Sequence, residues 1–152
     1  MIRWETCKQD FKFDGAWLDI YVFGTTIEDW QSLFNVLQAS YTFAYSVDGK
    51  PQQFPKTIEE VFSVRKSACP ALSFLVGRIS VACHFFHDKE IEFDIDPRGV
   101  TSQAELDVLL NFLCLIGNTI HRSVILTPEN GPEHPILTYN SESKTFLFHS
   151  VN

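Results

Sequence analysis

Hydrophobic and polar residues alternate strictly from residue 90 to residue 96, where the chain reads Glu-Ile-Glu-Phe-Asp-Ile-Asp. Successive side chains of a β-strand point to opposite faces of the sheet, so this pattern predicts a strand with one apolar and one acidic face. The apolar set is Ile91, Phe93 and Ile95, and the acidic set is Glu90, Glu92, Asp94 and Asp96. We expect the apolar face to enter a core and the acidic face to meet water or a partner.

Three segments have the hydrophobic spacing of helices. Each begins with a capping residue that is followed three positions later by an acid. The pairs are Thr26 with Asp29, Thr57 with Glu60, and Ser102 with Glu105. They predict helices over 27–39 and 102–119 and a short helix over 57–66. The helix over 102–119 is apolar around most of its circumference, so we expect it to be buried on more than one side.

Runs rich in β-forming residues, separated by turn signals such as Asp48-Gly49, predict the other strands. We expect these strands near residues 4–13, 17–23, 41–47, 71–76, 78–86, 124–127, 136–139 and 145–149. Strands in hairpins with segregated helices predict an α+β fold. It would be a mainly antiparallel sheet with two longer helices and one short helix packed against it. At 152 residues, the chain is expected to form a single globular domain over 1–152.

The strand over 78–86 is expected to pair with the acidic strand across a turn at residues 87–89. With Phe85 opposite Ile91, both strands direct their apolar side chains to one face, whereas a slip of one residue would place these side chains among the acids. The predicted register puts His84 opposite Glu92, Phe86 beside Glu90, and Ala82 beside Asp94 on the outer face.

The chain carries a net charge of −7, from 12 basic and 19 acidic residues. The few basic residues are scattered, which argues against direct binding of nucleic acid. The acidic charge is compatible with binding to a basic partner protein. It is also compatible with a role in solubility alone. Four widely spaced cysteines indicate a reducing compartment. Because neither a signal peptide nor an apolar run of about 18 residues is present, we expect a cytoplasmic protein that spans no membrane.

Sequence motifs for phosphate-binding loops, serine hydrolases, zinc proteases and EF-hands are absent. A single alternating strand displays its carboxylates in a row, whereas a metal site needs ligands that converge from several elements. We therefore expect no metal, no cofactor and no catalytic residues. The alternative that stays open is a metal-dependent hydrolase that uses Asp94, Asp96 and His84.

Residues 128–135 form a predicted loop that contains three prolines together with Glu129, Glu133 and His134. A loop that is stiff before binding loses little entropy on binding, which suits recognition. A plain proline-rich connection between two strands is the other interpretation of this segment.

Two further segments carry a resemblance to known proteins. The strand Trp17-Leu18-Asp19-Ile20-Tyr21-Val22 leads into a helix start at 26–30, and Cys83-His84-Phe85-Phe86 precedes the acidic strand. With its small size and acidity, the chain resembles the immunity proteins of bacterial polymorphic and contact-dependent-inhibition toxin systems. The resemblance implies a non-enzymatic inhibitor that covers the active site or substrate groove of a toxin, often a basic nuclease.

The acidic strand offers a surface for such a toxin. Carboxylates on one face of a strand are about 7 Å apart, which is close to the phosphate spacing along one nucleic acid strand. We expect Glu90, Glu92, Asp94 and Asp96 to contact basic side chains of the toxin, with His84 and Phe86 packing nearby. Besides the hydrolase, a domain that binds a small ligand or associates with itself through an edge strand stays open.

Overall fold

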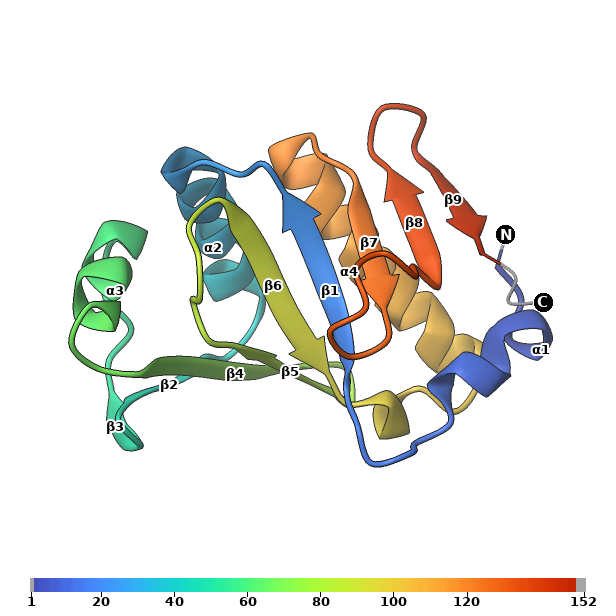
Figure 1. Ribbon diagram of the computed structural model, residues 1–152, viewed down its shortest axis with the longest axis horizontal. Helices are drawn as coiled ribbons and strands as arrows, with labels where there is room; N and C mark the ends of the chain where they lie inside the picture. Colours follow the sequence, from blue (N-terminus) through green and yellow to red (C-terminus); the bar gives the residue numbers. More distant parts are fainter. Residues whose placement is uncertain (1, 150–152) are drawn as a thin grey trace.

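A computed structural model describes residues 2–149, and a nine-stranded sheet dominates it (Figure 1). All neighbouring strands are antiparallel, in the order β3-β2-β4-β5-β6-β1-β7-β8-β9. The strands are β1 Leu18–Phe23, β2 Ala44–Val47, β3 Lys50–Gln52, β4 Pro70–Val76, β5 Ile79–Cys83, β6 Glu90–Ile95, β7 Val124–Thr127, β8 Leu137–Asn140 and β9 Thr145–Phe148. The helices are α1 Trp4–Cys7, α2 Ile27–Ser40, α3 Ile58–Arg65 and α4 Gln103–Ile120, with 3₁₀ turns η1 Lys8–Phe11 and η2 Pro97–Gly99. The predicted α+β class is confirmed.

Helices α2 and α4 cover one face of the sheet, and the core lies between them and the strands (Figure 1). Phe93 of β6 contacts both helices, with its ring centroid 6.0 Å from that of Phe34 and 5.9 Å from that of Phe112. Helix α3 lies beside α2, where Phe62 meets Trp30 edge-on at 5.0 Å. The opposite face, which we call the open face, carries no helix within residues 2–149.

The three predicted helix starts are confirmed. Thr26 and Asp29 form a reciprocal capping box, in which each side chain accepts the backbone N–H of the other residue. The Thr57 and Ser102 hydroxyls accept the backbone N–H groups of Glu60 and Glu105. These bonds satisfy N–H groups that have no partner inside the helix. No helix within residues 2–149 is long and apolar enough to cross a membrane.

The predicted strand over 4–13 is wrong, because this segment forms α1 and η1. Trp4, Cys7 and Phe11 are three and four positions apart, which is helical spacing. The strand prediction gave too much weight to the aromatic residues of this segment. Cys7 and Phe11 are buried, and the Trp4 ring packs 5.7 Å from that of Phe11. The prediction also missed the short edge strand β3.

The predicted register of β5 and β6 is confirmed where the two strands pair, at Val81 with Ile95 and at Ala82 with Asp94. However, β5 ends at Cys83 and does not continue to residue 86 as predicted. Phe85 has a φ of +57°, a left-handed conformation that is rare for a bulky residue. This conformation takes the chain out of the sheet while the Phe85 side chain stays buried in the core.

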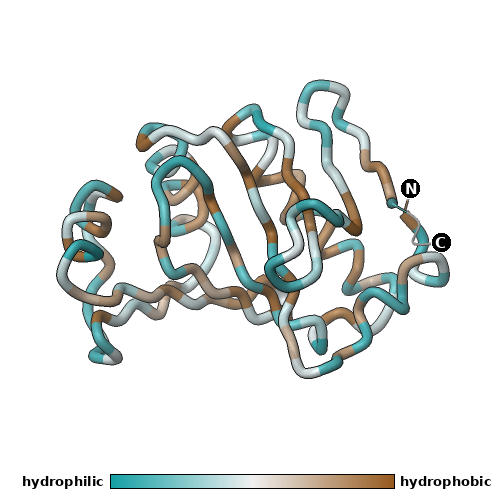
Figure 2. Tube along the Cα trace, in the orientation of Figure 1, coloured by the Kyte–Doolittle hydropathy of each residue, from teal (hydrophilic) through white to brown (hydrophobic). Residues whose placement is uncertain are grey.

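On its other side, β6 pairs with β1 along the full length of both strands, from Leu18 opposite Ile95 to Phe23 opposite Glu90. Local patterns in the sequence do not indicate that β1 lies beside β6. Hydrophilic and hydrophobic residues alternate along β6, whereas β1 is hydrophobic except for Asp19 (Figure 2). An acidic strand therefore lies inside the sheet, and the residues that β1 directs to the open face lie beside its carboxylates.

Candidate functional site

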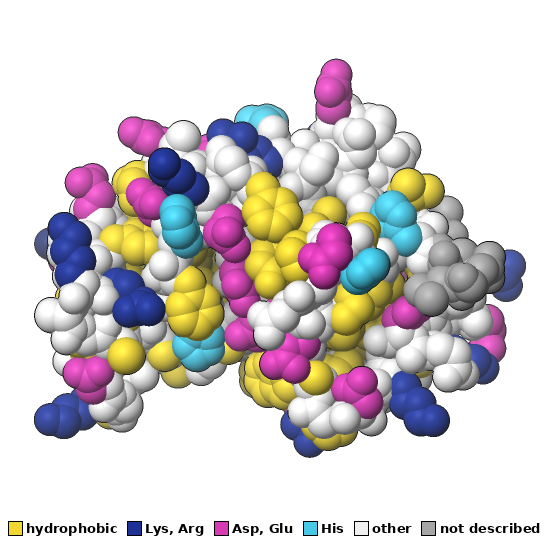
Figure 3. Space-filling model, in the orientation of Figure 1, with side chains coloured by type: hydrophobic (Ala, Val, Ile, Leu, Met, Phe, Trp, Pro, Cys, Tyr) yellow, Lys and Arg dark blue, Asp and Glu magenta, His cyan; other side chains and the backbone are white. Residues whose placement is uncertain are grey.

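A groove of about 500 Å³ crosses the open face where β5, β6 and β1 lie side by side. We call it the acidic groove. Its floor consists of Ala82, Glu92, Asp94 and Asp19, and its walls are His84 and Phe86 on one side and residues 15–17 and 129–130 on the other. Figure 3 shows acidic side chains gathered in this hollow, with hydrophobic groups on both sides.

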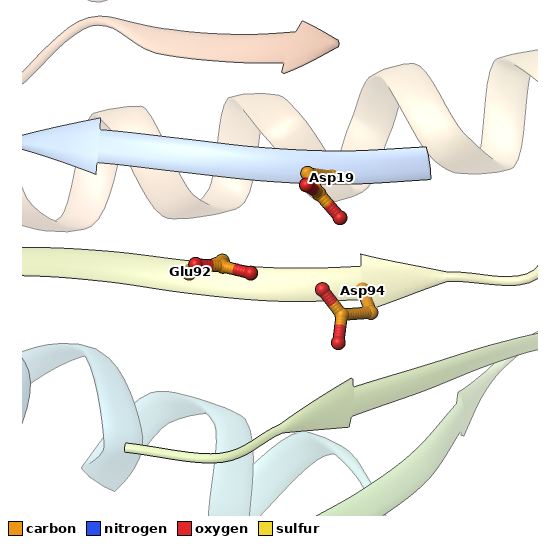
Figure 4. Close-up of side chains that lie close together, drawn as sticks. All are labelled: Asp19, Glu92 and Asp94. Atoms are coloured by element: carbon orange, nitrogen blue, oxygen red, sulfur yellow. The ribbon is translucent and has the colours of Figure 1, made fainter. Parts of the chain in front are cut away.

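Three carboxylates converge on the floor of the groove. The strand register places Asp19 directly opposite Asp94 and places Tyr21 opposite Glu92. One carboxylate oxygen from each of Asp19, Glu92 and Asp94 lies within 4.8 Å of the other two (Figure 4). Because like charges on opposite cross-strand positions repel, this arrangement costs folding free energy unless a proton or a cation is shared.

The surroundings of these acids favour their protonated forms. Burial, together with the nearby charges of Asp94 and Asp19, raises the pKa of Glu92 to about 8. Burial and the neighbouring Asp94 raise the pKa of Asp19 to about 6, against the opposing effect of a hydrogen bond from the Asn130 backbone. Near pH 7, Glu92 is therefore mostly protonated, and the groove can release this proton when a cation enters.

Asp19 is the most deeply buried of the three acids, with 3% of its surface exposed. Its Oδ2 accepts hydrogen bonds from the Tyr21 hydroxyl at 3.1 Å and from the backbone N–H of Asn130 at 2.8 Å. The second bond ties the proline-containing loop between β7 and β8 to the edge of the groove; in Figure 1 this loop passes in front of the sheet. Asp19 thus connects the floor of the groove to one of its walls.

The two predicted neighbours, His84 and Phe86, line the opposite wall. His84 Nε2 is 3.7 Å from Asp94 Oδ2, so His84 meets Asp94 and not Glu92 as the continued strand would require. The His84 ring stacks on Phe86 at 5.4 Å. Phe86 is 59% exposed, and the guanidinium carbon of Arg65 lies 5.8 Å from its ring centroid.

The other two acids of the predicted row lie outside the groove. Asp96 caps η2, and its carboxylate accepts hydrogen bonds from the backbone N–H, Nε and Nη2 of Arg98, which hold its pKa below the usual range. Glu90 lies at the start of β6 opposite Phe23, which is 47% exposed. Only two of the four predicted acids, Glu92 and Asp94, therefore line the groove. Asp19 from the neighbouring strand β1 completes the cluster.

Asp19 was missed by reasoning from the sequence. A charged residue between the apolar Leu18 and Ile20 in an otherwise buried strand was the available signal. Residues of this kind are rarely buried without a specific partner. Local patterns could not identify β6 as the strand that lies beside Asp19. Hydrophobic periodicity predicts the elements themselves, but it does not predict which distant strands pair.

The groove is suited to positively charged groups. Three convergent carboxylates match the oxygen ligands of a hard divalent cation, and they equally match an ammonium or guanidinium group. The hydrolase hypothesis named Asp94, Asp96 and His84, but Asp96 is paired with Arg98 and Asp94 lies with Asp19 and Glu92. Within residues 2–149, these last three form the only such cluster of potential metal ligands.

No protein-family model, curated protein sequence or solved structure matches this chain.

Proposed function

We propose that this protein is an inhibitor that binds a basic partner protein through the acidic groove, as an immunity protein neutralises its cognate toxin. The observation that supports this most directly is the convergence of Asp19, Glu92 and Asp94 in a groove of the open face. Repulsion within such a cluster lowers the stability of the unbound protein. A lysine or arginine side chain that enters the groove removes this repulsion, so binding restores the lost stability.

The hydrophobic surroundings fit a protein partner. Phe86 and Phe23 lie on either side of β6, one after β5 and the other on β1, and both are about half exposed. Exposed aromatic side chains next to a charged, partly desolvated centre are typical of residues that dominate binding energy in protein interfaces. A toxin that acts on nucleic acid has a basic surface of matching charge, and its inhibition requires no catalysis.

The test is capture of partners by tagged protein from a lysate of the source organism, at low salt, followed by binding kinetics with the recovered partner. A basic protein should be captured by the wild type and lost by the double variant Glu92→Lys, Asp94→Lys. We expect association to slow by roughly tenfold or more and to lose most of its salt dependence.

A matched control carries two acid-to-lysine substitutions away from the groove, at Glu59 in α3 and Glu142 in the turn before β9; both side chains are exposed. This control should retain the partner. Equal loss with both double variants would indicate a non-specific effect of net charge, and unchanged binding by the groove variant would refute the proposal.

A divalent-cation site that serves a hydrolase is the second candidate, because three carboxylate oxygens lie within 4.8 Å of one another. The chain would supply Asp19, Glu92 and Asp94 as ligands, with His84 beside Asp94. In this case Mg²⁺, Mn²⁺ or Ca²⁺ alone should raise the melting temperature, more at pH 8 than at pH 6 because Glu92 must lose its proton. Asp94→Asn should abolish the shift, and an absent shift with every ion would exclude this candidate.

A further inference from the structure

The sheet has two terminal strands, β3 and β9, and they differ in how they meet solvent. The outer strand β3 reads Lys50-Pro51-Gln52, and all three side chains are exposed. Pro51 has no backbone N–H to donate, and Lys50 brings a charge to the edge. Both features are typical of sheet edges that resist pairing with another chain.

The opposite edge has neither kind of protection. Strand β9 reads Thr145-Phe146-Leu147-Phe148, without a charge or a proline. Leu147 is 59% exposed, and Phe146 and Phe148 are partly buried. Within residues 2–149 the only strand paired with β9 is β8, so its outer backbone groups have no strand partner. A regular, apolar, unprotected edge is the form that pairs with another strand.

Charge favours a second copy of the same chain at this edge. Residues 143–149 include no carboxylate, and the ionisable residues there are Lys144 and His149, although the whole chain carries −7. Two copies can therefore approach through β9 with little of the repulsion that two acidic grooves would experience. The groove is separated from β9 by β7 and β8, so this contact leaves the groove accessible.

We propose that two copies of the chain associate by antiparallel pairing of β9 with β9 about a twofold axis. The contact is self-complementary, and one continuous sheet then runs through both copies. Further growth would need the β3 edge, which Pro51 and Lys50 protect, so assembly stops at a dimer. A four-residue strand falls below the roughly 1,200 Å² of a standard stable interface, so we expect a dissociation constant weaker than about 1 μM.

Analytical ultracentrifugation from about 1 μM to about 1 mM brackets such an affinity. The weight-average mass of the wild type should rise from 17.4 kDa toward twice that value. Leu147→Lys places like charges near the twofold axis and should remain monomeric throughout, with an unchanged circular dichroism spectrum. Leu75→Lys is the matched control, because Leu75 is also 59% exposed but lies on β4; it should dimerise as the wild type does.

Hydrogen exchange supplies a second measurement that needs no variant. Backbone amides of 145–148 should exchange more slowly as concentration rises, whereas those of 50–52 should not change. A wild-type mass that stays at the monomer value, dimerisation that persists in Leu147→Lys, or dissociation by Leu75→Lys would each overturn the proposal. None of these residues lines the groove. The dimer proposal can therefore fail without affecting the proposed inhibitor function, and the reverse also holds.

Discussion

Asp19 and Asp94 lie directly opposite each other on the adjacent antiparallel strands β1 and β6, and Glu92 completes a cluster with them. Two carboxylates in such positions normally destabilise a sheet. The buried Asp19 is compensated by hydrogen bonds from Tyr21 and Asn130. Glu92 instead keeps its proton near neutral pH, so the stability of the fold and the charge of the groove depend on the same groups.

Replacing Glu92 with Gln should change how stability depends on pH. The pKa of Glu92 is raised from 4.5 to about 8 in the folded protein, so the folded state binds this proton more tightly than the unfolded chain does. The resulting stabilisation is fully present below about pH 4.5 and is lost as pH rises to about 8. Over this pH range, the free energy of unfolding of Glu92→Gln should fall less than that of the wild type. The difference between the two proteins should be on the order of 2 kcal/mol after allowance for solvent screening.

Urea denaturation at intervals from pH 5 to pH 8.5 measures this difference. Glu142→Gln is the control, because Glu142 is exposed in the turn between β8 and β9, and its pH profile should match that of the wild type. Parallel profiles for Glu92→Gln and the wild type would show that the three carboxylates do not share a proton.

Replacing Asp19 with Ala should loosen the loop between β7 and β8. The substitution leaves the Asn130 N–H and the Tyr21 hydroxyl without their acceptor, which costs about 1–3 kcal/mol. Hydrogen exchange of residues 128–136 should become faster, and the free energy of unfolding should fall. Asp19→Asn keeps an acceptor oxygen and should lose less; equal losses in both variants would show that the negative charge of Asp19, and not its acceptor oxygen, holds the loop.

The faces of β6 and its register with β5 were predictable from the sequence because burial decides both. A slip of one residue would bury acids, so the alternation from Glu90 to Ile95 and from Ile79 to Cys83 permits one pairing. Beyond Cys83 the same alternation continues, yet β5 ends at Cys83 and Phe85 adopts a left-handed conformation. The Phe85 ring packs against Trp30 and Phe34 in α2, and this contact holds the backbone in its position. A contact between distant residues cannot be predicted from local periodicity.

The centre of the candidate site was less predictable. Glu92, Asp94, His84 and Phe86 were identified from the hairpin, but Asp19 reaches them only because β1 is inserted between β6 and β7. Sheet order is decided by the packing of the whole core. Similarly, Asp96 matched the acidic pattern, but Arg98, two residues later, binds it, and Asp96 caps η2.

Replacing Gly117 with Ala should destabilise the protein, although alanine favours helices by about 1 kcal/mol. A Cβ at position 117 of α4 would lie 2.7 Å from Cδ2 of Tyr139 and 3.1 Å from the carbonyl oxygen of Arg122. We expect a net loss of about 1–3 kcal/mol in urea denaturation. Asn111→Ala, at an exposed position of the same helix, should be neutral or slightly stabilising; a similar gain in Gly117→Ala would show that α4 shifts freely against β8.

Phe85 and Phe86 are neighbours in sequence whose replacement by Ala should have opposite consequences. Phe85 is 1% exposed and packs among aromatic side chains, so Phe85→Ala should cost about 3 kcal/mol or more in the free energy of unfolding. Phe86 is 59% exposed, and Phe86→Ala should change this free energy by less than about 0.5 kcal/mol. Under the inhibitor proposal, Phe86→Ala should instead weaken binding of the recovered partner by about tenfold or more, because an aromatic wall of the groove is lost. Thermal denaturation and binding measured on the same samples separate the two effects. Unchanged binding in Phe86→Ala would show that Phe86 is not part of the interface.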